Sequence, residues 1–292
     1  MYLYVDGEIV PDRAAVISPY EHGFLYGAGL FETFRTYGGR PFLLKDHLTR
    51  LQEGAEEYGL CLPEDLEEEV HRAVAELLHT NELEDGYFRL NVSGGAEGIG
   101  LTAGVYENPR IIIYVKPLPP VQMQEKKLQT LKIRRNTPEG SVRRKSHHYM
   151  NNILAKRETG ASGNVEGLFL TEKNRLSEGT VSNLFFVKQK TIHTPDTSCS
   201  CLPGVTSRFV RELASALGYT VKEGSFYPKH MWNADEIFVT NSIQEIVSVF
   251  SWDDRPFPGK EGKITRELQS AYREAVQLVK KQPGKQGEGS NE

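Results

Sequence analysis

The chain contains few cysteines, and their spacing matches no common metal or disulfide pattern. Its 292 residues include three, Cys61, Cys199 and Cys201, with no CxxC pair and no histidine at a ligand spacing. This odd, sparse set argues against a disulfide framework and against structural zinc, so we expect no metal site. The pair in "TSCSCLPG" leaves a redox role open, but loop cysteines without a motif are usually unreactive.

Long apolar runs and an excess of basic charge are also missing. No segment approaches the roughly 20 apolar residues needed to cross a bilayer, and "MYLYVDGEIV" lacks the basic start and apolar core of a signal peptide. The 35 basic and 39 acidic residues give a formal charge of −4, so nucleic acid and anionic membranes are poor candidates as partners. We therefore expect a cytoplasmic protein that acts on a small molecule.

Strand-like and helix-like segments are both present. Apolar and polar residues alternate around Asp6–Gly7, which predicts a β-hairpin, and a second strand pair is expected within 22–44, turned at Gly38–Gly39. Apolar spacing then predicts two helices followed by two strands, at 45–58, 64–79, 86–95 and 110–117.

The stretch "PLPPVQMQEKK" breaks this pattern with three prolines among polar residues, which is typical of a domain connector. Beyond it we predict strands at 128–136, 165–171, 183–189, 191–195 and 235–242, and helices at 150–158, 203–218 and 264–279. These elements predict an α+β fold of two domains, at 1–116 and 128–280, joined by a connector at 117–127. The polar tail at 281–292 is expected to be disordered.

Lys145 lies in a cation-rich stretch, "SVRRKSHHYMNN". A lysine becomes a nucleophile only when burial or neighbouring cations lower its pKa. Arg143 and Arg144 precede it, but neighbours on a strand point to opposite faces, and we expect these arginines to be solvated. A basic surface turn is therefore the alternative interpretation. Of His147 and His148, we expect one to face solvent.

Other motifs supply an acid and groups that bind anions. Glu178 lies at a strand-to-turn junction, where a buried carboxylate needs either a protonated ring nitrogen or an ordinary salt bridge. Val205 and Thr206 begin a predicted helix whose free N–H groups and dipole attract anions. Ser242 ends a strand with a hydroxyl, and Arg50 on a helix is suited to bidentate phosphate binding. A solvated face or an ordinary helix start is the alternative for each.

Together these motifs provide a lysine, an acid for a ring nitrogen and several groups able to hold one phosphate, which is what pyridoxal phosphate (PLP) requires. The motifs "DHLTRL", "KSHHYMNNILAKRE", "SEGTVSNLFF", "LPGVTSRF" and "DEIFVTNS" occur in that order. Over nearly its whole length the chain resembles the fold-type IV PLP enzymes: branched-chain aminotransferases, D-amino acid aminotransferases and 4-amino-4-deoxychorismate lyases. The resemblance implies a smaller N-terminal α/β domain, a larger PLP-binding domain and a homodimer.

The resemblance also implies roles for individual residues. Lys145 is similar in position to the lysine that forms the internal aldimine with PLP and then acts as acid and base. Glu178 resembles the carboxylate that keeps the pyridine nitrogen protonated. Tyr149 resembles a tyrosine near the cofactor's phenolic oxygen, although its spacing from the lysine differs by one residue from that of the branched-chain enzymes. The residues implied for the phosphate are Arg50, Val205, Thr206 and Ser242.

Within this family, "SPYEHGFLYGAGLFETFR" and "RRNTPEGSVRRKSHHYMNNILAKRE" most resemble the Bacillus-type 4-amino-4-deoxychorismate lyases. D-amino acid aminotransferases carry an arginine and a histidine in the loop that here reads "GGAEGIGLTAG", which has neither. Arg89 matches an arginine of the branched-chain enzymes and is a candidate to bind a substrate carboxylate. The resemblance implies a lyase that forms 4-aminobenzoate and pyruvate for folate biosynthesis. A branched-chain or D-amino acid aminotransferase, and a non-enzymatic phosphate-binding module, are the alternatives.

Overall fold

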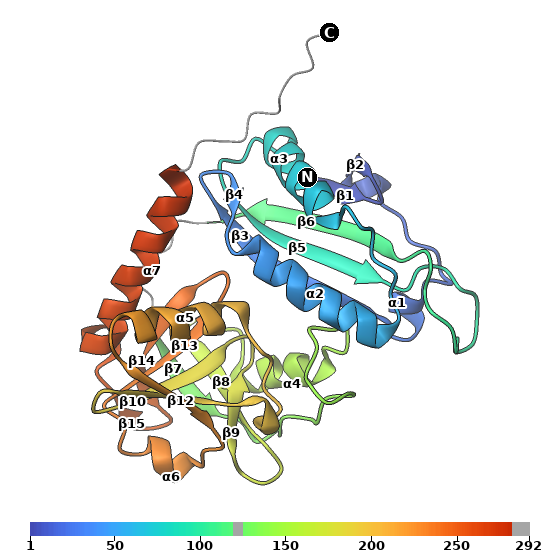
Figure 1. The fold of residues 1–292 in the computed structure, drawn as a ribbon. Coiled ribbons are helices and arrows are strands. Elements are labelled where there is room, and N and C mark those ends of the chain that lie inside the picture. Colours follow the sequence, from blue (N-terminus) through green and yellow to red (C-terminus); the bar gives the residue numbers. More distant parts are fainter. Residues whose placement is uncertain (119–124, 282–292) are drawn as a thin grey trace.

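Two β-sheets dominate the computed structural model, which describes residues 1–118 and 125–281 (Figure 1). The first sheet has six strands in the order β2-β1-β6-β5-β3-β4, and neighbouring strands run antiparallel. All six precede residue 118: β1 (Tyr2–Val5), β2 (Glu8–Pro11), β3 (Gly29–Tyr37), β4 (Arg40–Pro41), β5 (Gly86–Ser93) and β6 (Arg110–Pro117).

Both hairpins predicted for this sheet are present. Asp6 and Gly7 turn β1 into β2 with positive φ angles of 46° and 101°, and Gly38–Gly39 turn β3 into β4 with 59° and 74°. Positive φ at both turn residues matches the twist of antiparallel strands. The start of the predicted segment 22–44 is not a strand, however. It is the short helix α1 (His22–Leu25), because the Glu21 side chain accepts the N–H of Phe24 and caps it.

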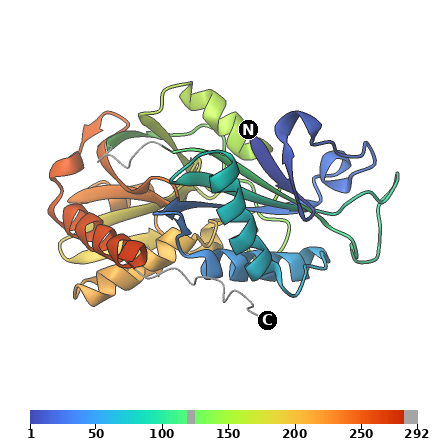
Figure 2. The same cartoon turned by 90° about the horizontal axis from the view of Figure 1, so that it is seen from above.

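Helices α2 (Leu44–Tyr58) and α3 (Leu66–Thr80) cover one face of this sheet (Figures 1 and 2). Strand side chains alternate between faces. Phe34 and Phe88 therefore pack beneath the helices. Thr33 and Arg89 are the next pair opposite each other on β3 and β5, so their side chains belong to the opposite face. The helix-covered face forms the core, which leaves the other face to line a site.

The second sheet has nine strands in the order β12-β11-β10-β13-β14-β7-β8-β9, with β15 paired to β14. Parallel pairs (β7–β8, β7–β14 and β11–β12) and antiparallel pairs occur together, as in an α+β fold. The strands are β7 (Glu125–Thr130), β8 (Val165–Leu170), β9 (Leu176–Gly179), β10 (Asn183–Lys188), β11 (Thr191–Pro195), β12 (Thr220–Gly224), β13 (Glu236–Asn241), β14 (Glu245–Trp252) and β15 (Arg255–Pro256).

The remaining helices are α4 (Met150–Thr159), α5 (Val205–Ala216), α6 (Pro228–Met231) and α7 (Lys263–Lys281). Helices α5 and α7 bury Val210, Leu268 and Tyr272 against the second sheet. Tyr37 and Phe42, from the end of the first sheet, join this same core. Helix α7 also contacts β3 (Figure 1). The two sheets are thus packed together through a shared apolar cluster.

The predicted helices all occur, with ends that differ by a few residues. The predicted strand at 128–136 is wrong beyond Thr130, where the chain leaves the sheet and the N–H of Lys132 donates to the Glu158 side chain at 2.6 Å. The predicted connector begins within β6 and ends within β7, and its residues 119–124 lie outside the described residues, as does the tail after 281. The division into two domains stays a prediction.

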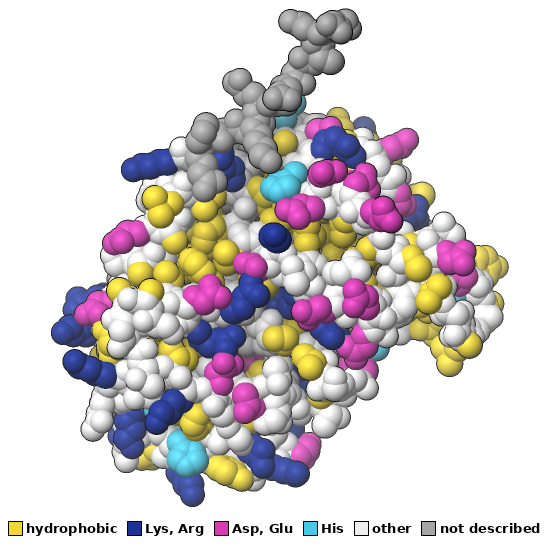
Figure 3. All heavy atoms as spheres, viewed as in Figure 1, with side chains coloured by type: hydrophobic (Ala, Val, Ile, Leu, Met, Phe, Trp, Pro, Cys, Tyr) yellow, Lys and Arg dark blue, Asp and Glu magenta, His cyan; other side chains and the backbone are white. Residues whose placement is uncertain are grey.

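Two surface features follow from the composition. Among the described residues, no helix is both long and apolar enough to span a bilayer. Basic and acidic side chains are interspersed over the face in Figure 3, in keeping with the small net charge.

Candidate active site

One pocket of about 440 Å³ collects every site residue predicted from the sequence. Its walls come from both sheets: β3 and β5 on one side, and the start of α5 with the turns β9–β10 and β13–β14 on the other. The predicted residues that line it are Arg50, Arg89, Lys145, Tyr149, Glu178, Val205, Thr206 and Ser242.

Lys145 is held at the edge of β3 by backbone contacts. Its carbonyl accepts the N–H of Phe31 at 2.8 Å, and its Nζ lies 4.4 Å from the centre of the Phe31 ring. Burial, and then the charge of Arg50, lower the pKa of Lys145 to about 8. The amine can therefore gain or lose a proton near neutral pH, as a nucleophile or an acid–base group must.

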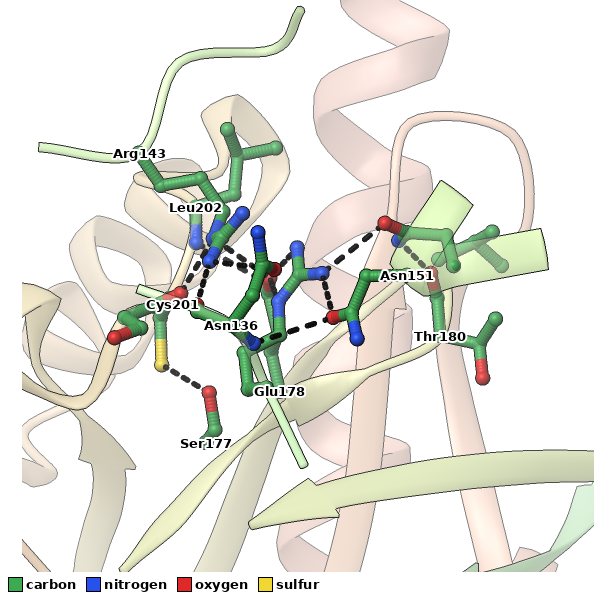
Figure 4. Close-up of polar contacts among 12 residues, drawn as sticks. Asn136, Arg143, Asn151, Ser177, Glu178, Thr180, Cys201 and Leu202 are labelled. Carbon is green, nitrogen blue, oxygen red and sulfur yellow. Dashed lines mark hydrogen bonds and ion pairs between the residues drawn. The ribbon is translucent and has the colours of Figure 1, made fainter. Parts of the chain in front are cut away.

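Glu178 lies at the pocket in an arginine-rich surrounding (Figure 4). Its Oε1 accepts two hydrogen bonds from Arg135, at 3.0 Å from Nε and 2.7 Å from Nη2. Its Oε2 accepts the N–H of Leu202 at 2.9 Å, and Nε of Arg143 is 3.9 Å from Oε1. Glu178 therefore forms the ordinary salt bridge that was the alternative interpretation. It also lines the pocket, so the salt bridge does not exclude a contact with a ligand there.

The expectation that both arginines before Lys145 are solvated is wrong for Arg143. It is 7% exposed, and its Nε donates to the Ser200 carbonyl at 2.6 Å (Figure 4 shows the side chain beside Asn136). Burial, and then the charge of Arg135, lower its pKa. The prediction failed because residues 141–146 form no strand, so alternation does not apply to them. Arg144 instead pairs with Glu53 and Glu57 near the surface.

The start of α5 provides donors for an anion. Gly204 is the N-cap and supplies no side chain, so the first N–H groups of the helix, at Val205 and Thr206, are not capped by one. The Thr206 and Ser242 hydroxyls lie 3.1 Å apart. Among the described residues, the buried Thr240 hydroxyl has no hydrogen-bond partner. This end of the pocket has the donors of a phosphate site.

Glu32 is a site residue that the sequence interpretation missed. It accepts two hydrogen bonds from Arg50, and its Oε2 lies 2.7 Å from Nδ1 of His47. Burial opposes its ionised form, but the Arg50 charge and the His47 hydrogen bond outweigh burial and lower its pKa to about 2. Burial lowers the pKa of His47, whose Nδ1 faces Glu32 and whose Nε2 lies 3.4 Å from the Ser242 hydroxyl. A lone carboxylate in the apolar strand "LFETF" was the available signal.

Arg89 and Tyr149 form an aromatic and cationic wall with Phe31. The guanidinium carbon of Arg89 lies 3.6 Å from the Phe31 ring centre, and its Nε donates to Asn91 at 3.0 Å. Burial lowers the pKa of Arg89 and raises that of Tyr149 to about 12. Tyr149 packs edge-on against Phe31. The Arg89 guanidinium and the Tyr149 ring therefore line the pocket, and both are packed against the Phe31 ring.

The other candidates from the sequence are less suited to chemistry. His148 is exposed, as expected for one of the two histidines, and lies 3.3 Å from Glu139. Burial lowers the pKa of His147 to about 4. Cys199 and Cys201 are buried, and burial raises the pKa of both thiols, which disfavours the reactive thiolate.

The chain matches the family described as "Amino-transferase class IV" over residues 29–252. It is 41% identical over 281 residues to "Aminodeoxychorismate lyase" of Bacillus subtilis (strain 168), covering 94% of each chain. It is 35% identical to "Putative branched-chain-amino-acid aminotransferase" of Methanocaldococcus jannaschii, covering 94% of this chain and 96% of that protein.

A solved structure agrees with these likenesses. It is the 4-amino-4-deoxychorismate lyase from Pseudomonas aeruginosa, with a TM-score of 0.83 and 30% identity over 93% of this chain and 98% of that one. The two-sheet α+β architecture is thus that of the fold-type IV enzymes, which depend on PLP. With a family match over more than half of its length, the chain belongs to the amino-transferase class IV family.

Proposed function

We propose that the protein is a PLP-dependent aminodeoxychorismate lyase, which converts 4-amino-4-deoxychorismate to 4-aminobenzoate and pyruvate for folate biosynthesis. The observation that carries the proposal is the greater identity to the Bacillus subtilis lyase than to the Methanocaldococcus jannaschii aminotransferase, over almost the whole of both chains. The pocket supports a PLP enzyme, because its lysine, acid and anion-binding groups converge on one cavity.

The residues present fit PLP. Val205 and Thr206 offer N–H groups at the start of α5, and Arg50, Thr206 and Ser242 add charge and hydroxyls for its phosphate. The unpartnered Thr240 hydroxyl at the same wall is a further polar group without a protein partner among the described residues. Glu178 would hold the ring nitrogen, Tyr149 would lie near the phenolic oxygen, and Lys145 would hold the aldehyde carbon.

When bound, PLP supplies a protonated pyridine ring that accepts electrons from the substrate carbon. Glu178 would stabilise that protonated ring nitrogen, and Arg135 and Arg143 hold the carboxylate in place and balance its charge. Lys145 can act as a base only after the substrate amino group has replaced it at the aldehyde carbon. Its freed amine, whose pKa is about 8, would then take the proton from the amine-bearing ring carbon of the substrate. It then returns a proton to the departing enolpyruvyl oxygen as the ring becomes aromatic.

Arg89 is the arginine we assign to a substrate carboxylate. Arg50, Arg135, Arg143 and Arg144 also line the pocket, but each of them has a carboxylate partner within the chain. No carboxylate of the described residues forms an ion pair with Arg89. A half-buried guanidinium that lacks an internal partner gains most from a carboxylate brought in by the substrate.

The test is turnover of 4-amino-4-deoxychorismate by purified protein with PLP, measuring 4-aminobenzoate and pyruvate together. Equal yields without any added oxo acid are expected. The second candidate is a branched-chain or D-amino acid aminotransferase, and the likeness to the Methanocaldococcus jannaschii protein favours the branched-chain form. No 4-aminobenzoate, with glutamate formed from 2-oxoglutarate and an amino acid, would select that candidate and leave the cofactor residues unchanged.

We also propose that the protein is a cytoplasmic homodimer of two-domain subunits. Several large apolar side chains on the first sheet's periphery are strongly exposed, among them Phe24 at 69%, Ile99 at 84% and Leu101 at 87%. Exposed apolar groups of this size favour contact with another protein surface. Light scattering coupled to size exclusion measures the mass, and a mass of one subunit at micromolar concentration contradicts the dimer.

A further inference from the structure

A buried ion pair outside the predicted site residues lies between two turns of the pocket wall. Lys126 on β7 and Glu166 on β8 are 5% and 3% exposed, and Nζ lies 3.1 Å from Oε2. Strand β7 runs parallel to both β8 and β14, its neighbours in the sheet. The first turn (179–182) joins β9 to β10, and the second turn (241–244) joins β13 to β14. Apolar residues usually stabilise a core at least as well as a buried ion pair, so stability alone does not explain this pair.

Glu166 holds the first turn in place. Its Oε1 accepts the N–H of Val181 at 3.1 Å and the hydroxyl of Ser182 at 2.8 Å. Gly179 passes so close that a Cβ added there would lie 2.6 Å from the same oxygen. The whole first turn lines the pocket and directly follows Glu178. The carboxylate therefore fixes the position of this part of the wall.

Lys126 holds the second turn. Its Nζ donates to Oε1 of Gln244 at 2.9 Å. Within the turn, the Asn241 side chain accepts the N–H groups of Ile243 and Gln244 at 3.0 and 2.8 Å. Glu245 follows with a φ of 62°, a conformation that is costly for a residue other than glycine and that persists only where its surroundings enforce it. All four residues of the second turn line the pocket.

We propose that Lys126 and Glu166 are positioning residues that couple the two turns and so set the spacing of this part of the pocket wall. The chain of contacts runs from Val181 and Ser182 through Glu166 and Lys126 to Gln244. A change at Glu166 therefore reaches the second turn through Lys126, and a change at Lys126 reaches the first turn through Glu166. The kinetic consequence rests on the proposed function, whereas the coupling itself does not.

Hydrogen–deuterium exchange of the PLP-loaded full chain tests the coupling. In Lys126→Met and in Glu166→Gln, peptides covering both turns should exchange about threefold faster or more, because local opening costs less free energy. The matched control is Lys127→Met, since Lys127 lies next in the chain and its partly exposed side chain is 3.8 Å from Asp254. Two results would overturn the proposal. One is faster exchange only in the turn that the replaced residue contacts, and the other is an equally large increase in exchange in Lys127→Met.

Kinetics of a double variant test the consequence for substrate. Lys126→Met with Glu166→Met replaces the ion pair by apolar side chains, a change that buried sites often tolerate, so folding should be retained. KM for 4-amino-4-deoxychorismate should rise about tenfold while kcat at saturating PLP stays within about threefold. PLP affinity should fall as well, because Ser242 of the proposed phosphate site lies in the second turn. An unchanged KM contradicts the positioning role. If the wild-type protein forms no 4-aminobenzoate, the proposed function fails, and the exchange experiment still decides whether the turns are coupled.

Discussion

Glu32 holds the Arg50 guanidinium through two hydrogen bonds: Nε donates to Oε1 at 2.8 Å, and Nη2 donates to Oε2 at 2.6 Å. Such paired bonds fix the plane of the guanidinium as well as its position. The remaining terminal nitrogen, Nη1, donates to the Pro203 carbonyl at 2.9 Å, just before α5. Glu32 thus joins the first sheet to the anion-binding end of the pocket, and it acts there through Arg50.

Replacing Glu32 by glutamine should weaken cofactor binding. The amide keeps the size of the side chain but accepts at one atom only and carries no charge, so Arg50 loses its fixed orientation. We expect the affinity for PLP to fall about 10- to 100-fold, the effect of losing one charge-assisted contact. Absorbance titration of cofactor-free protein measures it. The control is Glu56→Gln on the exposed side of α2, and equal affinities in the two variants would contradict this role.

The same carboxylate predicts a pH dependence of stability. Its pKa is lowered from 4.5 to about 2 in the folded protein, so its contribution is present above about pH 4.5 and is lost as pH falls towards 2. The shift corresponds to about 3 kcal/mol. The difference in unfolding free energy between wild type and Glu32→Gln should therefore shrink from pH 6 to pH 3. Urea unfolding at the two pH values measures it, and an unchanged difference argues against an ionised Glu32.

The pKa of Lys145 should move in opposite directions when its two charged neighbours are removed. The Arg50 charge lowers this pKa and the Glu32 charge raises it. Arg50→Met should shift the pKa upward from about 8, and Glu32→Gln should shift it further down. Site-resolved labelling of the cofactor-free protein by an amine-reactive reagent, followed against pH, gives the midpoint. Lys145→Ala should lose both this labelling and all turnover.

Arg144→Met is the matched control for that experiment. Arg144 lines the same pocket and precedes Lys145 in the chain, but its charge is balanced by Glu53 and Glu57. Its loss should leave the midpoint near pH 8. Shifts of the same sign in Arg50→Met and Glu32→Gln would mean that general loosening of the pocket, rather than charge, controls the lysine.

The candidate site could be proposed from the sequence because each motif carries its own local signal. Lys145, Glu178 and the start of α5 lie in short segments whose order and composition match a family, and the structure places them around one pocket. The longer helices α2, α3, α4, α5 and α7 were predicted for a similar reason, since 3.6-residue spacing is visible within a single segment. The four-residue helices α1 and α6 are too short to show it and were not predicted. Strand β14 was missed because its first five residues are all buried, so no polar alternation marks it.

The partners of the site residues could not be predicted in this way. Arg135 meets Glu178 across 43 residues, and Glu32 meets Arg50 across 18, on different elements in both cases. These pairings depend on how the strands and helices are placed in space. Composition shows only that a carboxylate in an apolar strand requires some partner. The burial of Arg143 was mispredicted because its partners include the Ser200 carbonyl, 57 residues away.

Arg89→Met should raise KM for 4-amino-4-deoxychorismate about 100-fold, because the substrate carboxylate loses a charged partner in a partly buried site. KM of Arg89→Lys should lie between those of the wild type and Arg89→Met, since lysine keeps the charge without the planar pair of donors. PLP affinity should not change in either variant. Arg110→Met is the control, because Arg110 pairs with Asp6 outside this pocket. Loss of PLP binding together with the KM effect would reassign Arg89 to the cofactor.

Glu178→Gln should separate the electronic role of this carboxylate from its structural one. Glutamine can still accept from Arg135, so we expect a folded protein with a modest loss of thermal stability. A neutral amide cannot stabilise a proton on a ring nitrogen, and kcat should therefore fall by about 100-fold or more. Glu53→Gln, at the outer side of Arg144, controls for the loss of one negative charge. Full activity in Glu178→Gln, with PLP bound, would show that the carboxylate serves only to pair with the buried arginines.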